Sequence, residues 1–214
     1  MPDPTFPNLT VLTHPLIQHK LTLLRDRRTG TREFKQLIGE IATLMAYEVT
    51  RDLGTSEVEI DTPLEHTAGR QVSSRGVTLV PILRAGLGMV DSVALLLPTA
   101  QIGHLGLYRD HASLEPVSYY SKLPEITAER EYLILDPMLA TGGSALAAAT
   151  TLKTAGAQRI RFICIVAAPQ GVRRMLDGHP DVRIFTAALD RELSPSGYIL
   201  PGLGDAGDRM FGTE

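Results

Sequence analysis

Short apolar runs, each closed by a turn and followed by a helical pattern, recur along most of this 214-residue chain and restrict its fold more than any other feature. The runs are apolar throughout rather than alternating, which is typical of strands that are buried on both faces. The sequence therefore predicts an α/β fold with a mainly parallel sheet flanked by helices. We expect strands at residues 77–83, 102–108, 131–135, 160–167 and 183–188, and helices at 31–52, 86–97, 143–155 and 171–177.

No shift in composition and no internal repeat divides the chain, so one domain spanning residues 1–214 is expected. Residues 1–30 begin with a proline-rich stretch that is expected to form an N-terminal arm. Residues 110–130 are polar and lie between two predicted core strands, and excursions of that length are usually functional. We therefore expect a β-arm or flap there. Its Tyr119, Tyr120 and Lys122 would lie over a substrate or in a dimer contact.

Composition narrows the possible partners and locations. The net charge is −3, so no basic field indicates binding to nucleic acid or to an anionic membrane. No apolar run reaches the roughly 18 residues that a membrane helix needs, and residues 1–4 do not resemble the start of a signal peptide. A cytoplasmic location is therefore expected. The single cysteine, Cys164, lies within an apolar run and is expected to pack in the core.

The stretch at residues 131–144 is the most informative about ligands. An apolar strand ends at Asp136, a turn of small residues follows, and a helix then begins. Free N–H groups at such a helix start form an anion site, to which Thr141 and Ser144 add hydroxyls, and glycines at 142–143 permit close approach. A carboxylate accepts hydrogen bonds from hydroxyls and repels anions. The stretch therefore fits a sugar phosphate, with an ordinary strand–turn–helix joint as the alternative.

Two arginines follow predicted strands in the same way. Arg84 and Arg109 come at carboxyl ends of strands, which is where open parallel sheets bind ligands. A guanidinium fork can pair with phosphate oxygens, and a structural ion pair is the alternative.

A glycine-rich segment lies near the C-terminus. Gly202, Gly204 and Gly207 formally match the dinucleotide fingerprint, but too few residues follow for the helix and strand that this fingerprint requires. Such a segment can instead bring backbone groups to the edge of a flat heterocycle. A plain C-terminal turn is the alternative. The six histidines show no metal-binding spacing, and no nucleophile-elbow motif is present.

The run Asp136-Pro-Met-Leu-Ala-Thr-Gly-Gly-Ser144 resembles the phosphate-binding loop of type I phosphoribosyltransferases. Most of those proteins have two adjacent acids where this chain has Asp136-Pro137, and the uracil phosphoribosyltransferases share the form seen here. Four further stretches resemble the same family in the same order, so that the resemblance runs from His14 to the end of the chain. They are residues 14–20, 81–89, 103–110 and 197–212.

The resemblance implies a type I phosphoribosyltransferase fold and a pentosyltransferase of pyrimidine salvage. Such an enzyme converts uracil and 5-phospho-α-D-ribose 1-diphosphate (PRPP) to UMP and diphosphate. The implied catalytic residues are Asp205, Arg109 and Asp136. The implied PRPP ligands are Arg84, Arg109, Asp136, Pro137, Met138, Leu139, Ala140, Thr141, Gly142, Gly143, Ser144 and Asp205. Uracil would bind in the segment 194–214, at Ile199, Gly204, Asp205 and Ala206.

The resemblance also implies partners that no motif here specifies. Mg²⁺ is the expected cofactor, carried by PRPP and placed near Asp205, with no protein ligand set defined. GTP is expected as an allosteric activator, and a homodimer or homotetramer as the assembly.

Three other functions fit the fold. An RNA-binding regulator of pyrimidine genes would need a basic face, which the scattered lysines and arginines do not form. A phosphoribosyltransferase for another base would need a different C-terminal segment. An inactive paralogue is disfavoured because every candidate ligand residue is present.

Overall fold

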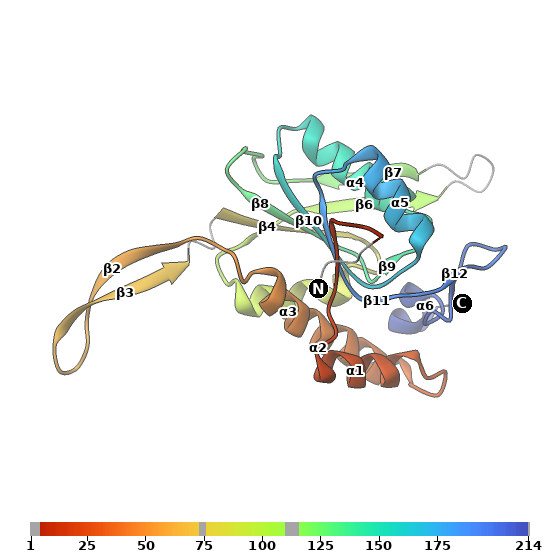
Figure 1. The fold of residues 1–214 in the computed structure, drawn as a ribbon, viewed down its shortest axis with the longest axis horizontal. Coiled ribbons are helices and arrows are strands. Elements are labelled where there is room, and N and C mark those ends of the chain that lie inside the picture. Colours follow the sequence, from red (N-terminus) through yellow and green to blue (C-terminus); the bar gives the residue numbers. More distant parts are fainter. Residues whose placement is uncertain (1–4, 73–75, 110–115, 214) are drawn as a thin grey trace.

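A mainly parallel sheet runs through the protein, seen in a computed structural model that describes residues 5–72, 76–109 and 116–213 (Figure 1). Its strands are β1 (Leu9–Val11), β4 (Val77–Leu83), β5 (Gln101–Ile102), β6 (His104–Arg109), β7 (Pro116–Lys122), β8 (Glu131–Leu135), β9 (Met138–Leu139), β10 (Arg159–Ala167) and β11 (Arg183–Leu189). The order across the sheet is β1-β11-β10-β8-β4-β6-β7, with β5 beside β4 and β9 beside β10. Among these pairs β6 and β7 are antiparallel and the rest are parallel.

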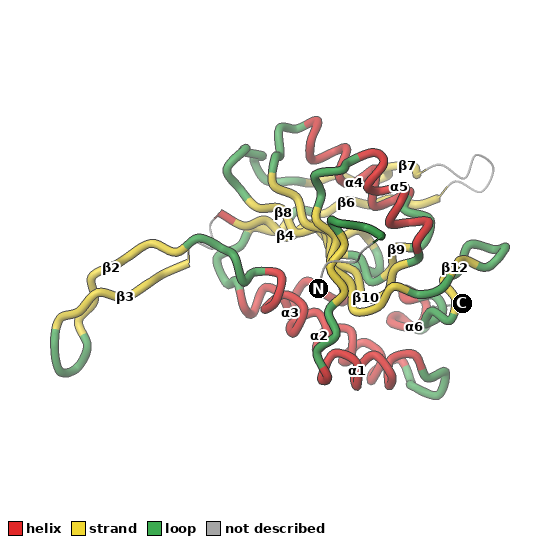
Figure 2. Tube along the Cα trace, in the orientation of Figure 1, coloured by secondary structure: helices red, strands yellow, loops and turns green. Residues whose placement is uncertain are grey.

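Helices cover both faces of this sheet, as Figure 2 shows in red against the yellow strands. The helices are α1 (Pro15–Arg25), α2 (Thr31–Val49), α3 (Leu87–Leu96), α4 (Gly143–Thr154), α5 (Pro169–Gly178) and α6 (Ala206–Phe211). Residues of α1, α2, α3 and α6 share one apolar cluster, and residues of α4 and α5 share the other. The predicted α/β class is confirmed.

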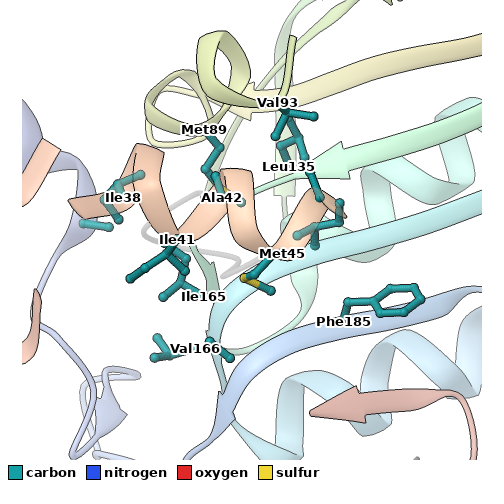
Figure 3. Packing of buried hydrophobic residues seen from close by; sticks show 14 of the residues in the cluster. Ile38, Ile41, Ala42, Met45, Met89, Val93, Leu135, Ile165, Val166 and Phe185 are labelled. Atoms are coloured by element: carbon teal, nitrogen blue, oxygen red, sulfur yellow. The ribbon is translucent and has the colours of Figure 1, made fainter. Parts of the chain in front are cut away.

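Successive side chains of a strand point to opposite faces of the sheet and so belong to different apolar clusters. In β8, Leu133 and Leu135 belong to the cluster with α2, whereas Tyr132 and Ile134 belong to the cluster with α4. All four are buried, which is why the run is apolar at every position. Figure 3 shows the first cluster, in which Met45 and its neighbours on α2 lie between α3 and the strands.

Cys164 is buried in β10, in the cluster with α4, which confirms its predicted packing role. Burial raises the pKa of its thiol to about 12, so the group stays neutral at physiological pH.

The predicted N-terminal arm is wrong for its described part, residues 5–30. Residues Leu9–Val11 form β1, an edge strand parallel to β11, and residues 15–25 form α1. Ile17, Leu21 and Leu24 recur at helical spacing and are buried, so this segment completes the core. Pro15 suits the first turn of α1, and the His14 side chain accepts a hydrogen bond from the Leu16 amide.

The predicted flap at residues 110–130 is described from residue 116 onward. Its β7 pairs antiparallel with β6, so this part is an edge strand of the main sheet. The predicted strand 102–108 is divided at Gly103 into β5 and β6. Residues 110–115, which join β6 to β7, lie outside the described residues.

Figure 1 also shows a two-stranded hairpin, β2 (Thr55–Asp61) and β3 (His66–Val72), that extends from the body as an arm. The sequence did not predict it. Its strands are mostly polar and have no buried face, so they lack the continuous apolar run that marks the core strands. No helix in the described ranges has both the length and the apolar character needed to span a bilayer.

Candidate active site

The candidate site lies where the chain changes direction across the sheet. Strands β4 and β8 are neighbours, with Pro81 opposite Leu135. From β4 the chain continues to β6 on one side, and from β8 it continues to β10 on the other. Ligands of open parallel sheets bind outside the carboxyl ends of strands at such a reversal. Arg84 and Asp136 directly follow β4 and β8, so the fold places both residues at this edge.

Gly86 holds the two strand ends close together. A Cβ at this position would lie 2.3 Å from the Leu135 carbonyl oxygen and 2.7 Å from that of Ile82. The turn after β4 therefore packs directly against the end of β8, and a larger residue would separate Arg84 from Asp136.

The turn at residues 140–144 has the geometry predicted for an anion site. Gly142 has φ of 79° and forms the N-cap of α4 without a side-chain cap, and the amides in the first turn of a helix have no intrahelical partner. A Cβ on Gly142 would lie 2.7 Å from the Gly171 carbonyl oxygen. A Cβ on Gly171 would in turn lie 2.4 Å from the Ala140 carbonyl oxygen. The turn is thus seated on the backbone of α5.

Asp136 is a half-buried carboxylate at the centre of the site. Burial raises its pKa to about 7, and the negative charge of Asp205 adds to the rise. A hydrogen bond from the Met138 amide to Oδ1, at 3.2 Å, acts in the opposite direction. No ion pair to Asp136 occurs among the described residues, so the group is suited to accept hydrogen bonds from a ligand.

Arg84 is exposed and reaches across to the C-terminal helix. Its Nη2 lies 3.4 Å from Asp208 Oδ1, and its guanidinium lies 6.0 Å from the centre of the Phe211 ring. These are weak contacts that a ligand can replace. The backbone of Arg109 ends β6 at the same edge of the sheet, and its side chain lies outside the described part of the protein.

The C-terminal segment brings Asp205 to this edge. Asp205 is exposed and caps α6, with Oδ1 accepting from the Asp208 amide at 2.9 Å. A Cβ on Gly207 would lie 3.2 Å from Asp205 Oδ1 and 3.8 Å from Arg84 Nη2. Arg84, Asp136 and Asp205, which are distant in sequence, therefore meet at one site.

The predicted base-binding positions divide into an exposed and a buried group. Gly204, with φ of 80°, and Asp205 are exposed, and no hydrogen bond to the peptide groups of Gly204 occurs among those of the described residues. Ala206 begins α6 and is buried. Ile199 is buried in a short hairpin of β12 (Glu192–Leu193) and β13 (Ile199–Leu200). The Gly204 peptide groups and the amides of Asp205 and Ala206 have no partner among the described residues and are thus available to a flat ligand, whereas the Asp205 carbonyl accepts from the Arg209 amide.

The two tyrosines of the predicted flap lie on β7. Tyr119 and Tyr120 are both about half exposed, at 54% and 46%. Lys122 lies opposite His104, at the start of β6 and therefore at the far end of that strand from Arg109. A position over the site is excluded for Lys122 by this register.

Three charged residues that the sequence analysis did not single out support the C-terminal segment. Asp190, which follows β11, accepts two hydrogen bonds from Arg25 and one from the Gly202 amide. Arg209 donates to the carbonyls of Leu203 and Leu24. The one sequence signal was the position of Asp190 directly after a core strand.

Metal ligands are sparse in the described part of the chain, where no group of three or more histidine, cysteine, aspartate or glutamate side chains is arranged to hold an ion. Asp205 is exposed and uses one oxygen for capping. Mg²⁺ is usually held by one or two carboxylates together with substrate phosphates. The residues present fit a magnesium ion that arrives with a diphosphate.

The strand order and the helices on both faces give the fold of a type I phosphoribosyltransferase. Residues 11–213 match the family model described as uracil phosphoribosyltransferase. The chain therefore belongs to the uracil phosphoribosyltransferase family.

Curated relatives agree over nearly their full lengths. A protein named uracil phosphoribosyltransferase from Bacillus pumilus is 57% identical over 95% of this chain and 98% of its own. One of the same name from Clostridium kluyveri is 56% identical over 96% and 99%. Among solved structures, that of the AQ2163 protein from Aquifex aeolicus matches with a TM-score of 0.91 at 34% identity, covering 95% of this chain and 97% of the other.

Proposed function

We propose that this chain transfers the phosphoribosyl group of PRPP to N1 of uracil, forming UMP and diphosphate in pyrimidine salvage. The observation that carries the proposal is the meeting of the anion-binding turn, Asp136 and Asp205 at the sheet reversal, in a chain of this family. A sugar phosphate needs donors for its phosphate and acceptors for its hydroxyls, and the site offers both within one short stretch.

The turn at residues 137–144 would bind the 5-phosphate and the ribose. The amides of Ala140 to Ser144 and the Thr141 and Ser144 hydroxyls donate to the phosphate oxygens, assisted by the N-terminus of α4. Asp136 accepts from the ribose hydroxyls. Pro137, Met138 and Leu139 shape the wall between these two contacts. Strand β9 fixes the last two against β10, and the Pro137 carbonyl accepts from amides of β10.

The chemistry would consist of one displacement at C1′. The bond from C1′ to the diphosphate oxygen breaks, positive charge develops on the ribose ring, and N1 of uracil attacks from the opposite face. The electron pair of the broken bond leaves with diphosphate, and the N1 proton of uracil passes to that diphosphate or to water. Arg84 and Arg109 stabilise that leaving charge. The chain thus contributes positioning and electrostatics rather than a covalent intermediate.

Magnesium is part of this proposal, with Asp205 as the carboxylate that would face it. When bound, Mg²⁺ would neutralise charge on the diphosphate. The second oxygen of Asp205 has no partner within the described residues, whereas the first caps α6. Asp205 therefore keeps its position whether or not an ion is present.

Uracil would be read by backbone groups. The carbonyl and imide edge of a pyrimidine needs both donors and acceptors, and the Gly204 peptide groups together with the Asp205 and Ala206 amides are open to such contact. Buried Ile199 would pack beside the ring. A purine is larger and presents a different edge, so the segment favours uracil.

A base panel tests the function. Purified protein is mixed with PRPP, Mg²⁺ and, in separate reactions, uracil, orotate, adenine or hypoxanthine, and nucleotides are separated and weighed by mass spectrometry. We expect UMP alone, with one diphosphate released for each UMP. Nucleotide formation from another base in preference to uracil would overturn the proposal.

A cytoplasmic homo-oligomer completes the proposal. Both strands of the β2–β3 hairpin are exposed along nearly their whole length, and an isolated hairpin is marginally stable in water. A hollow at its base is lined by apolar groups that include Leu53 and Leu97. A second copy would cover both features. Activation by GTP remains an expectation, tested by adding GTP to the uracil reaction.

A further inference from the structure

Gly202 is the hinge on which the uracil-binding segment turns toward the site. Its φ is 62°, and a Cβ there would lie 2.1 Å from the Ile199 carbonyl oxygen. The residue is buried, two positions before the exposed Gly204. The orientation of the Gly202 peptide groups therefore determines the direction of the backbone that continues to residues 203–205.

Two charged side chains form hydrogen bonds with the backbone amide and carbonyl of Gly202. Asp190 Oδ2 accepts from the Gly202 amide at 2.9 Å, and Arg25 Nη1 donates to the Gly202 carbonyl at 2.6 Å. The same two side chains form a two-pronged pair, with Nη1 2.7 Å from Oδ2 and Nη2 2.6 Å from Oδ1. Charge-assisted, two-pronged bonds of this kind fix geometry as well as supplying energy.

Arg25 and Asp190 both belong to elements that pack in the core. Asp190 is 7% exposed, and its amide donates to the Ala167 carbonyl at the end of β10. Arg25 is the last residue of α1, whose apolar face is buried in the core. A central strand and a packed helix thus meet at Gly202.

We infer that the Arg25–Asp190 pair is a positioning device that sets uracil affinity by orienting the backbone edge at 204–206. This inference rests on the proposed function. Among the described residues no hydrogen bond joins either side chain to the turn at residues 140–144, so PRPP binding is expected to be independent of the pair. A residue that merely supports the fold would affect both substrates alike.

The test compares two substitutions that each remove one carboxylate charge from beside an arginine, partly buried Arg25 in one case and buried Arg161 in the other. Asp190→Asn strands Arg25. Glu131→Gln removes one of the two carboxylates that pair with Arg161, which is 6% exposed and lies at the opposite end of the strands; its Nε is 3.1 Å from Glu131 Oε2, and its Nη1 stays paired with Asp52. The two variants therefore make the same kind of change, the loss of one carboxylate charge beside an arginine, at opposite ends of the strands.

KM for uracil, KM for PRPP and kcat are measured for wild type and for both variants. We expect Asp190→Asn to raise the KM for uracil about tenfold to a hundredfold and to change that for PRPP less than about twofold. Glu131→Gln is expected to change neither KM. Equal rises in both KM values for Asp190→Asn, or an unchanged KM for uracil, would overturn the inference.

Arg25→Lys decides the matter if Asp190→Asn does not fold. Lysine keeps a positive charge beside Asp190, but a single ammonium cannot reproduce the three contacts of the guanidinium fork. We expect a rise of about fivefold or more in the KM for uracil alone. A wild-type protein that forms no UMP would contradict the proposed function, whereas an active variant with unchanged uracil affinity contradicts only the positioning role.

Discussion

Asp136 is a carboxylate whose burial changes its protonation. It is partly buried and forms no ion pair within the described structure, and its pKa is raised to about 7. The folded protein therefore binds a proton between about pH 4 and 7 that the unfolded chain releases. The stability from this proton is complete below pH 4 and is lost as the pH rises through 7.

Asp136→Asn removes this titration, so it should stabilise the ligand-free protein at pH 8 and have little effect at pH 4. The three-unit shift has an upper limit of about 4 kcal/mol, and solvent contact lowers the expected gain to about 1–2 kcal/mol. Thermal unfolding at both pH values measures it, with a rise in Tm of roughly 2–6 °C at pH 8. A variant less stable than wild type at pH 8 would show that the carboxylate is favourably paired. The same variant should lose most of its activity, because an amide is a poorer acceptor for ribose hydroxyls.

Asp205 is the second test at this level. Asp205→Asn retains an oxygen to cap α6, so the fold should survive while kcat/KM falls about a hundredfold or more. Circular dichroism checks folding and steady-state kinetics check activity. Near-normal turnover in the folded variant would remove Asp205 from the reaction.

Arg109→Ala addresses the diphosphate. We expect the KM for PRPP to rise about tenfold, and that for uracil much less. Equal losses for both substrates would argue against a diphosphate contact.

Contiguous residues of the site were predictable and distant partners were not. The strand, Asp136, the turn and α4 follow one another in sequence, so their chemistry could be read as one stretch. Arg25 and Asp190 are 165 positions apart, and neither has a sequence neighbour that indicates the other. Only the packing of α1 against the sheet brings them together.

Among the elements, the phosphate turn depends on glycine in two ways. Gly142 adopts a positive φ and also contacts the backbone of α5, whereas Gly156, beyond the other end of α4, has φ of 106° and open space around its Cβ position. Gly156→Ala therefore serves as a control for backbone strain alone.

Gly142→Ala should raise the KM for PRPP about tenfold or more, because the added methyl displaces the turn from Gly171. Gly156→Ala should cost about 1 kcal/mol of stability and leave the KM for PRPP unchanged. Equal kinetic effects of the two variants would show that strain, and not the seating of the turn, governs phosphate binding.

Core strands were predicted well because burial on both faces leaves a continuous apolar signal. The predicted bounds 77–83 and 131–135 match β4 and β8. The β2–β3 hairpin has no buried face within the described residues, so its pattern carried no such signal. Helix α1 was obscured by nearby prolines, although its buried positions recur at helical spacing.

For the whole molecule, the net charge of −3 does not indicate how charged groups are distributed at the site. Cationic Arg84 and a helix N-terminus lie beside two carboxylates at one edge of the sheet. Net charge therefore bears on bulk polyanions and not on a small anionic substrate.

The projecting hairpin makes a prediction about assembly. The wild-type protein should have a solution mass of two or four times 23.2 kDa. Replacing residues 56–71 with a short Gly-Ser link should lower that mass, because it removes the strands that would contact the second copy. Light scattering after size exclusion measures both. An unchanged mass would place the contact elsewhere.

The meeting of substrates at the sheet reversal can be seen in a crystal structure of the protein with UMP, the product that spans both halves of the site. We predict the phosphate on the amides of residues 140–144, ribose hydroxyls on Asp136, and the uracil edge on the backbone of 204–206. UMP bound with its phosphate away from the α4 N-terminus, or with its base away from the C-terminal segment, would contradict the arrangement described for this site.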